Sequence, residues 1–393
     1  MISITRLLCG RLGPSDAMRY GHGATAGVRE VGGRTVPAVV VWNCTAACNL
    51  RCAHCYSESG ATTNENELTG DEARALIDDL ADLGVRVLLF SGGEPLIRPD
   101  VIELGIYAAS RGLRPVLSTN GTLITPQMAE RIREAGFAYA GVSLDGLAQS
   151  NDEFRGVPGA FEQALGGIRN CLAAKVRVGV RFTLSRRTVG DLDNIFDLVR
   201  DNNIPRLCVY HLVYSGRGRA MAGDDLSHEE MRRAVETIFR RTEELAAQNA
   251  EIEVLTVDNP ADGVFLYLQQ REIDPARAAE TLRLLRANGG NSSGERIGCV
   301  SCDGDVFPDQ FWRTHILGNV RERRFSEIWN DGDNALLAGL RRRKDHITGR
   351  CATCRFFDTC GGGMRARAEA ISGDIWAEEP ACYLTDDEIH DEE

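Results

Sequence analysis

The chain has 393 residues, of which 43% are hydrophobic, and it carries a formal net charge of −12. This composition is typical of a globular protein, and the length allows one large domain or a barrel with a smaller appendage. The negative charge argues against general nucleic-acid binding, which needs a basic surface. There is no apolar run as long as a membrane span and no secretory pattern over residues 1–8, so we expect a cytoplasmic protein without membrane association.

Residues 1–36 are rich in glycine and arginine and show little periodicity, so we predict an irregular N-terminal arm. From Pro37 onward, short apolar runs alternate with amphipathic stretches, which indicates strand–helix units. We predict strands at 37–42, 85–90, 115–118, 139–144, 177–184 and 206–213, each followed by a helix, at 69–83, 100–111, 126–135, 159–173, 189–202 and 228–248. Six βα units predict an α/β fold in which a parallel, partial (β/α)6 TIM-like barrel is covered by helices.

Local signals fix several of these helix ends. Thr69 and Glu72 are spaced as a capping box, and Gly84 stands where a left-handed C-cap is expected. Thr125 precedes Pro126 at the next predicted N-terminus. Residues 250–290 are predicted to form a strand and linking helices.

Three thiols, Cys48, Cys52 and Cys55, follow the first predicted strand with the spacing Cys-x3-Cys-x2-Cys. Iron–sulfur clusters are normally held by four cysteines, so three ligands leave one iron open to a small molecule. A zinc site or a redox pair is the alternative, although such sites usually read Cys-x2-Cys twice. With His54 before the third cysteine, the motif resembles that of the radical S-adenosylmethionine (radical SAM) enzymes. This resemblance implies the same partial-barrel fold and a four-iron cluster to which S-adenosylmethionine (SAM) binds.

Polar motifs end the next strands, where ligands bind in folds of this kind. The motif Gly92-Gly93-Glu94-Pro95 resembles the family's site for the SAM amino group, and Glu94 can pair with an ammonium. The resemblance implies that His54 also belongs to the SAM-binding residues. Geometry and resemblance together predict that four residues contact the ribose and methionine of SAM: Ser118, Asn120, Ser143 and Asp145. Each of these four is also a common turn former.

Alternation on the fifth strand places Arg181 on the face opposite its apolar residues, in the barrel lumen. A buried arginine needs an anion. The carboxylate of SAM, a carboxylate of the substrate, and a structural pair with Asp145 or Glu94 are all open at this stage.

A second cysteine group, Cys351-x2-Cys354-x5-Cys360 with Cys382 further on, can close one cluster completely, although a zinc site is the alternative. It resembles the C-terminal SPASM extension of radical SAM enzymes, which usually holds two auxiliary clusters. Asp309 and Met364 stand where that family has further cysteines. We therefore predict one auxiliary four-iron cluster and leave Cys299 and Cys302 unassigned. The predicted domains are an N-terminal arm (1–36), a radical SAM barrel (37–250) and a SPASM-like domain (251–393).

Three stretches, at 39–45, 308–312 and 317–329, are similar to the haem d1 biosynthesis (NirJ) subfamily and its relatives in the alternative haem pathway. That resemblance implies removal of two propionates from the iron tetrapyrrole 12,18-didecarboxysirohaem by a 5′-deoxyadenosyl radical, with a small electron donor such as flavodoxin or ferredoxin. Because carboxylates bind basic groups, the predicted substrate residues are Arg217, Arg219 and Arg313, with Arg181 as a further option and His211 or His315 as possible iron ligands.

Three alternatives remain. A related haem synthase would convert propionates to vinyl groups. A peptide maturase is disfavoured by the incomplete SPASM cysteine set and by an arm too short for a peptide-binding winged helix. A cluster-bearing electron carrier without a reaction of its own is disfavoured by the three-cysteine motif.

Overall fold

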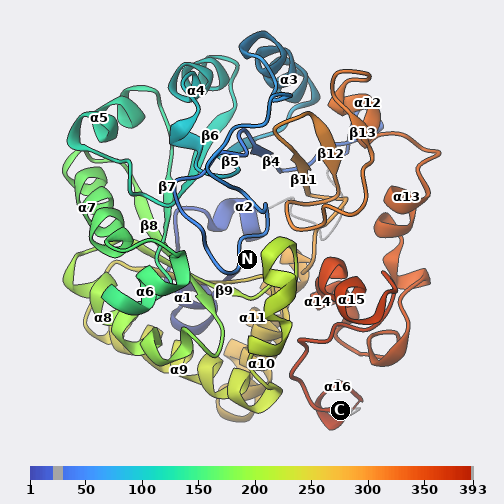
Figure 1. Cartoon of the computed structure of the whole chain (residues 1–393). Helices are drawn as coiled ribbons and strands as arrows, with labels where there is room; N and C mark the ends of the chain where they lie inside the picture. Colours follow the sequence, from blue (N-terminus) through green and yellow to red (C-terminus); the bar gives the residue numbers. More distant parts are fainter. Residues whose placement is uncertain (21–29, 391–393) are drawn as a thin grey trace.

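The computed structural model describes residues 1–20 and 30–390, and its centre is a parallel sheet (Figure 1). The six predicted strands are all present, and each pairs with the next in parallel. They are β4 (Val39–Asn43), β5 (Val87–Ser91), β6 (Arg114–Thr119), β7 (Ala140–Ser143), β8 (Val178–Leu184) and β9 (Arg206–His211). The predicted partial barrel is therefore confirmed.

The sheet extends beyond the six predicted units at both edges. β10 (Glu253–Val257) adds to β9 in parallel, and β11 (Ile297–Val300) adds to β4 in parallel. These two strands lie at opposite ends of the parallel run, so they do not close the barrel. Three short antiparallel strands complete the sheet: β1 (Ile2–Ser3), β12 (Asp305–Phe307) and β13 (Gly318–Asn319). The domain boundary at residue 250 stays a prediction. Residues on both sides of it contribute strands to one sheet.

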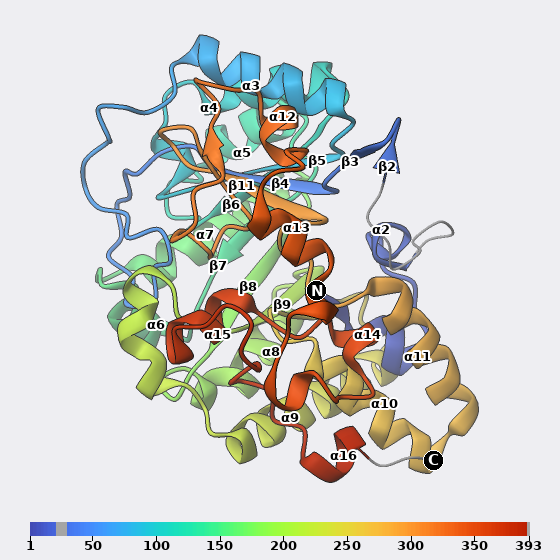
Figure 2. The same ribbon diagram turned by 90° about the vertical axis from the view of Figure 1, so that its right-hand side faces the viewer.

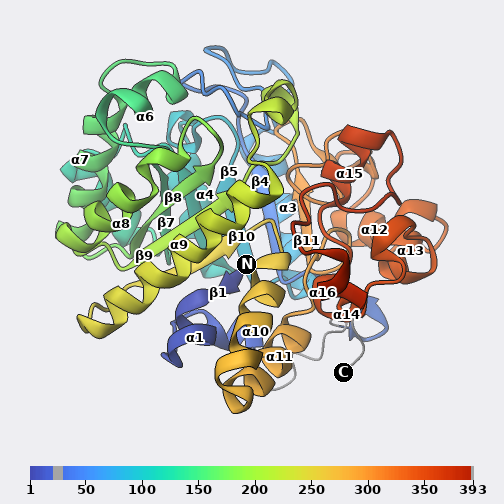
Figure 3. The same cartoon turned by 90° about the horizontal axis from the view of Figure 1, so that it is seen from below.

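Helices cover the outside of the sheet (Figures 1 and 3). The six predicted ones are α3 (Gly70–Leu83), α4 (Val101–Ser110), α5 (Pro126–Glu134), α7 (Ala160–Ala173), α8 (Leu192–Asp201) and α9 (His228–Ala247). The Thr69–Glu72 capping box forms, Gly84 is left-handed at φ 88°, and Thr125 caps α5. The outward side chains of β8 are fully buried against the helices, whereas Arg181 and Thr183 face the lumen side, as alternation predicts.

One helix of the barrel was not predicted. α6 (Ala148–Arg155) lies between β7 and α7. It follows β7 at the carboxyl end of the strand and brings Phe154 and Arg155 against the cysteine loop.

The prediction of an irregular N-terminal arm is wrong for the described residues. They contain β1, α1 (Ile4–Cys9), α2 (Asp16–Tyr20), and a hairpin of β2 (Glu30–Val31) with β3 (Arg34–Thr35). α1 packs against α9 and β10 (Figure 3). The buried guanidinium of Arg19 forms ion pairs with Asp16 (3.1 Å) and with Glu253 (2.8 Å), at the start of β10. These elements are too short to show periodicity, and long-range contacts order them; residues 21–29 of the predicted arm lie outside the described residues.

The C-terminal part lies along the open side of the barrel (Figure 2). Its helices are α10 (Ala261–Ile273), α11 (Pro275–Asn288), α12 (Phe325–Trp329), α13 (Ala335–Arg341), α14 (Phe357–Cys360), α15 (Arg365–Ser372) and α16 (Asp386–His390). Short 3-10 turns lie at Pro95–Ile97, Val189–Asp191, Gly216–Asp224, Arg343–Asp345 and Gly349–Cys351. In residues 1–20 and 30–390, no helix is long and apolar enough to cross a membrane.

Candidate active site and auxiliary cysteine centre

The three-cysteine loop leaves the carboxyl end of β4. Cys52 is buried with Leu50 and Ala160, and Cys48 and Cys55 pack against the same small cluster. Burial raises the pKa of Cys48 to about 11, so the bare thiol is protonated; coordination to iron would deprotonate it. The backbone N–H of Leu50 donates to Cys48 Sγ at 3.4 Å, a contact that also suits a thiolate ligand.

These thiols fit an iron–sulfur cluster better than a single ion. Within the described residues, no three Cys, His, Asp or Glu side chains converge closely enough to hold one metal ion. In a four-iron cluster each thiolate binds its own iron, so the sulfurs stand further apart than around one zinc. The donor set therefore suits a cluster held by Cys48, Cys52 and Cys55.

Neighbouring elements clamp this loop from two sides. On one side, the carbonyls of Phe154 and Arg155 accept hydrogen bonds from Ala53 N (2.9 Å) and Arg51 N (3.0 Å). On the other side, Arg217 donates through Nε to the Cys52 carbonyl (2.9 Å) and through Nη1 to the Ser59 carbonyl (3.0 Å). Arg217, predicted as a substrate residue, is thus bound to the cysteine loop.

His54 stacks on Phe154 with ring centroids 4.6 Å apart, and its Nε2 lies 3.6 Å from Asp145. Burial lowers the pKa of His54 to about 4, so the ring is neutral. Asp145 is fully buried, and its Oδ1 accepts from Thr183 N at 2.7 Å while Oδ2 contacts Arg155. Both carboxylate oxygens of this predicted SAM contact are therefore already in contact with protein groups.

The Gly-Gly-Glu-Pro motif packs directly against the cysteine loop. A Cβ on Gly93 would lie 2.0 Å from the Ala47 carbonyl, so only glycine allows this approach. The N–H groups of Gly93 and Glu94 donate to the carbonyls of Thr45 (2.8 Å) and Ala47 (2.7 Å). Gly92, at φ 128°, faces the Thr45 carbonyl in the same way, and Pro95 starts a 3-10 turn.

Glu94 joins this motif to the end of β6. Its carboxylate is fully buried and accepts from Asn120 N (2.8 Å) and Thr119 Oγ1 (2.8 Å). Burial raises its pKa to about 7. Asn120 Nδ2 in turn donates to Asn49 Oδ1 at 2.8 Å, next to Cys48. The structure thus brings Glu94 and Asn120 to the cysteine loop, and Ser143 ends β7 nearby.

Arg181 reaches from β8 across β7 toward β6. Its Nη1 donates to Ser118 Oγ, and a Cβ on Gly141 would lie only 2.3 Å from its Nε. Its Nε is buried without a hydrogen-bond partner, and in the part of the chain that the structure describes Arg181 forms no ion pair. The alternative of a structural pair with Asp145 or Glu94 is therefore wrong, and the carboxylates of SAM and of the substrate remain the two predicted partners.

The four C-terminal thiols form a second centre. Burial, and then the nearby thiols of Cys382, Cys351 and Cys354, raise the pKa of Cys360 well above its usual value. Backbone N–H groups of Glu379 and Phe356 point at Cys351 Sγ and Cys354 Sγ, both at 3.4 Å. Four thiols with amide donors suit a closed cluster.

The two positions that lack a cysteine have other roles. Asp309 is buried and accepts from Ser293 and from the N–H groups of Phe311 (2.8 Å) and Trp312 (2.9 Å). Met364 Sδ accepts from Asn291 Nδ2 at 3.3 Å. Both side chains hold the loops in place, which agrees with one auxiliary cluster.

The other predicted substrate residues come from β9, from the 216–224 turn and from the loop before β13. His211 is buried and its Nε2 is bonded to Asp262 (2.8 Å), whose carboxylate also accepts from Tyr383 (2.7 Å). His315 Nε2 is bonded to Glu369 at 2.7 Å. Arg313 lies over the Phe307 ring at 5.7 Å, and Arg219 is exposed in the 216–224 turn.

Sequence reasoning missed two residues of the site. Arg155 Nη1 donates to Cys52 Sγ at 3.5 Å. Tyr56, next to the last ligand, donates to Asn43 Oδ1 (3.0 Å), shares a hydrogen bond with Ser91 Oγ (3.0 Å) and packs edge-on against Phe311. Arg155 gave no local signal because its helix is short, whereas Tyr56 could have been noted for its place beside Cys55.

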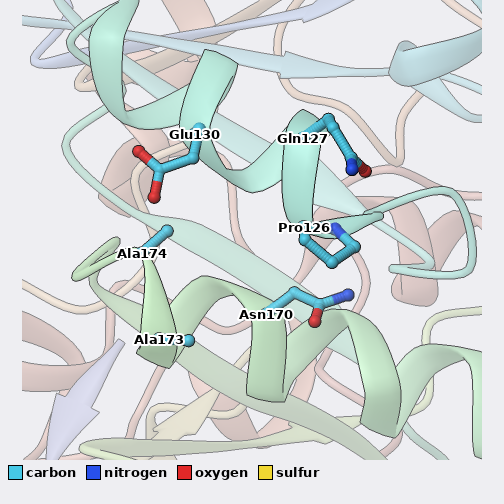
Figure 4. Close-up of a pocket in the computed structure, with 6 residues that line it drawn as sticks. All are labelled: Pro126, Gln127, Glu130, Asn170, Ala173 and Ala174. Atoms are coloured by element: carbon cyan, nitrogen blue, oxygen red, sulfur yellow. The ribbon is translucent and has the colours of Figure 1, made fainter.

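Two pockets are lined by residues of α7, and Val157, which lines the second, also packs against the cluster of Leu50, Cys52 and Ala160. One, between α5 and α7, holds about 270 Å³ and is lined by small and polar residues such as Gln127 and Asn170 (Figure 4). A second lies between α6 and α7. The former is smaller than typical ligand sites and has no convergent chemistry, so we do not assign it to catalysis.

Comparisons with known proteins agree with this geometry. Residues 42–199 match the radical SAM superfamily model, and residues 293–355 match the SPASM iron–sulfur cluster-binding domain. The chain belongs to the radical SAM enzymes that carry a SPASM domain. Its cofactors are therefore SAM, a four-iron cluster and an auxiliary iron–sulfur cluster.

Three relatives extend over most of the chain. It is 51% identical to an Fe-coproporphyrin III synthase of Methanosarcina barkeri, over 99% of both chains. It is 41% identical to a pre-heme d1 synthase of Dinoroseobacter shibae, over 89% of this chain and 87% of that one. An AdoMet-dependent heme synthase of M. barkeri is 35% identical, over 88% and 96%. Among solved structures, SuiB of Streptococcus suis bound to S-adenosylmethionine has the same fold, with a TM-score of 0.68 and 18% identity, covering 89% of this chain and 78% of that one.

Proposed function

We propose that this enzyme modifies the carboxylate side chains of an iron tetrapyrrole in a haem pathway. The observation that carries the proposal is the 51% identity to an Fe-coproporphyrin III synthase along 99% of both chains. The relatives at 41% and 35% identity are also named for haem-type products.

The higher identity favours Fe-coproporphyrin III as the product. Coproporphyrin III carries methyl and propionate groups but no acetates. Starting from the predicted substrate, 12,18-didecarboxysirohaem, the enzyme would then remove two acetates and keep the propionates. The haem d1 reaction, which removes two propionates from the same substrate, is the second candidate because of the 41% identical relative.

The proposed roles follow from the contacts of each residue. When bound, the cluster and SAM supply a 5′-deoxyadenosyl radical that takes a hydrogen atom from the substrate. Glu94 would bind the SAM ammonium, and Ser118, Asn120 and Ser143 would orient its ribose and methionine. Arg181, which forms no ion pair with the described residues, would bind the SAM carboxylate, because it reaches toward Ser118 on that side of the lumen.

Substrate carboxylates would meet basic groups other than Arg181 and Arg217. Arg313 and exposed Arg219 are the proposed partners. His315, fixed by Glu369, is the proposed iron ligand ahead of His211, because His211 is buried and paired with Asp262. We place the reaction in the cytoplasm, with flavodoxin or ferredoxin as the electron donor, as the sequence predicts.

The test is anaerobic incubation of the reconstituted, reduced protein with SAM and 12,18-didecarboxysirohaem, followed by measurement of 5′-deoxyadenosine and tetrapyrrole mass. Stepwise loss of two acetates supports the first candidate, and loss of two propionates supports the haem d1 candidate. Deoxyadenosine with an unchanged tetrapyrrole contradicts both. The Cys48→Ala variant, which lacks a cluster ligand, is the control for background cleavage.

A further inference from the structure

A buried ion pair lies directly behind the cysteine loop. Arg155, at the end of α6, contacts Asp145 through Nη2 and donates through Nη1 to Cys52 Sγ at 3.5 Å. The side chains are only 9% and 0% exposed, respectively. One nitrogen of the guanidinium therefore contacts a carboxylate, and another donates a hydrogen bond to a predicted cluster ligand.

The position of Arg155 is fixed by several independent contacts. Its carbonyl accepts from Arg51 N at 3.0 Å, so the backbone of α6 is tied to the loop that it serves. Asp145, two residues beyond the end of β7, accepts a hydrogen bond from Thr183 N at 2.7 Å. Both ends of the ion pair thus rest on the barrel, and the guanidinium has little freedom to leave the sulfur.

The chemistry of the sulfur gives this contact a consequence. Reduction adds negative charge to a cluster, and hydrogen bonds or positive charge at its sulfurs favour the reduced form. An arginine stays charged at any physiological pH, and a buried hydrogen bond acts in a medium of low dielectric constant. Among the described residues, Arg155 is the charged side chain that donates to a sulfur of the three-cysteine motif.

We propose that Arg155, held by Asp145, is a positioning residue that raises the reduction potential of the cluster bound by Cys48, Cys52 and Cys55. It does so by donating a hydrogen bond to the Cys52 sulfur. An electron donor with a less negative reduction potential could then reduce the cluster. This inference rests on the cluster site and holds for either candidate tetrapyrrole reaction.

The test compares variants of the full-length, cluster-loaded protein. Arg155→Met with Asp145→Asn removes the donor and its counter-charge together, so no buried charge is left unpaired. Arg155→Lys keeps the charge without the planar fork. Arg206→Lys is the matched control, because Arg206 is also buried and paired with a carboxylate (Glu253, 2.7 Å). It lies at the amino end of β9, whereas the cysteine loop lies at the carboxyl ends of the strands.

The readouts are iron content and the midpoint potential, from an anaerobic redox titration followed by electron paramagnetic resonance. The signal that changes on addition of SAM identifies the three-cysteine cluster. For the double variant we expect unchanged iron and a reduced-to-oxidised ratio at least tenfold lower at fixed potential, a shift of about 59 mV to more negative potential for one electron. Arg155→Lys should shift less in the same direction, and Arg206→Lys should not shift.

An unchanged potential in a fully loaded double variant would overturn the proposal. Loss of the cluster in Arg155→Lys as well as in the double variant would also overturn it, because Arg155 would then be needed only for assembly. A shift of equal size in Arg206→Lys would show a general effect of buried arginines and would count against it too.

Discussion

Glu94, the proposed partner of the SAM ammonium, would couple SAM binding to pH. Burial raises its pKa to about 7, from an ordinary value of 4.5. Below pH 7 the carboxyl is therefore largely neutral, and above pH 7 it is charged. A SAM ammonium binds only the charged form well, so SAM affinity should fall as the pH falls through 7.

The first prediction concerns this dependence. SAM should bind about eightfold more weakly at pH 6 than at pH 7.5, as calculated from the ionised fraction at a pKa of about 7. In Glu94→Gln the affinity should fall roughly 10- to 100-fold at pH 7.5, since a charge-assisted bond is lost, and its pH dependence should flatten. Equilibrium binding of SAM to the cluster-loaded protein measures both. A Glu94→Gln variant with the same slope as the unmodified protein would show that another group titrates.

Gly93 is a second case in which a single residue determines a contact. Gly93 lies so close to Ala47 that any side chain would collide with its carbonyl. The motif therefore serves the contact between two loops as well as any ligand. This explains why a glycine pair precedes Glu94 in the sequence.

At the scale of elements, α6 is the helix on which the cysteine loop rests. Its C-cap, Gly156, is left-handed at φ 75°, and a Cβ there would lie 2.7 Å from the Arg51 carbonyl. Gly159, three residues on, is also left-handed at φ 80°, but its nearest neighbour is Gln163 Nε2 at 3.7 Å. The two glycines carry similar backbone strain and differ in their contact with the loop.

The second prediction uses this pair. Gly156→Ala should lower occupancy of the three-cysteine cluster by about half or more, because the new methyl pushes Arg51 and its neighbours away. Both variants pay the left-handed penalty of about 1 kcal/mol, so Gly159→Ala should keep full occupancy. Iron and sulfide per chain, with the SAM-responsive spectrum, measure the effect. Equal iron in the two variants would contradict the clamp.

The auxiliary cysteine centre combines one short stretch of sequence with a cysteine further along the chain. Cys351, Cys354 and Cys360 come from one short stretch, and Cys382 closes the set from beyond α15. Tyr383, beside it, is bonded to Asp262, which also holds His211 at the end of β9. The buried carboxylate of Asp262 thus ties the centre to the barrel.

The third prediction follows from the presence of two separate cysteine centres. Cys354→Ala should lower the iron content from about eight to about four per chain, because one of two four-iron clusters is lost. SAM cleavage should continue while tetrapyrrole product falls, if the auxiliary cluster relays the electron left by the reaction. Equal loss of both activities would instead indicate a structural role. Deoxyadenosine and product measured in the same sample distinguish these results.

At the scale of the whole molecule, the N-terminal segment fastens one end of the barrel. Glu253 starts β10 and is paired with Arg19 from α2 and with Arg206 at the start of β9. This ionic group connects residues that are over 200 positions apart in the chain. It lies at the amino ends of the strands, opposite the cysteine loop.

The fourth prediction is that Arg19→Met destabilises the protein by about 2 kcal/mol, because Glu253 loses one of its buried partners but keeps another. The melting temperature should fall by about 2–4 °C. Arg283→Met, which breaks the exposed pair with Glu280, should change little. A melting temperature that is the same in all three proteins would show that the segment does not support the barrel.

The sequence by itself determined the features that depend on local physics. Short apolar runs indicated the six strands, the Thr69 and Thr125 caps indicated two helix starts, and the cysteine spacings indicated two centres. Each of these signals lies within a few residues, so no knowledge of distant contacts was needed. Alternation also placed Arg181 in the lumen correctly, although it left its partner open.

Only the tertiary structure decided which side chains meet across the chain. It showed that Arg181 has no carboxylate partner among residues 1–20 and 30–390, that His211 is held by Asp262, and that Arg155 reaches Cys52 from over 100 residues away. It also ordered the described residues of the N-terminal arm, placed β10, the strand predicted within residues 250–290, at one edge of the sheet, and added β11 at the other. These features depend on packing between segments far apart in sequence, whose short elements have too little periodicity to be recognised alone.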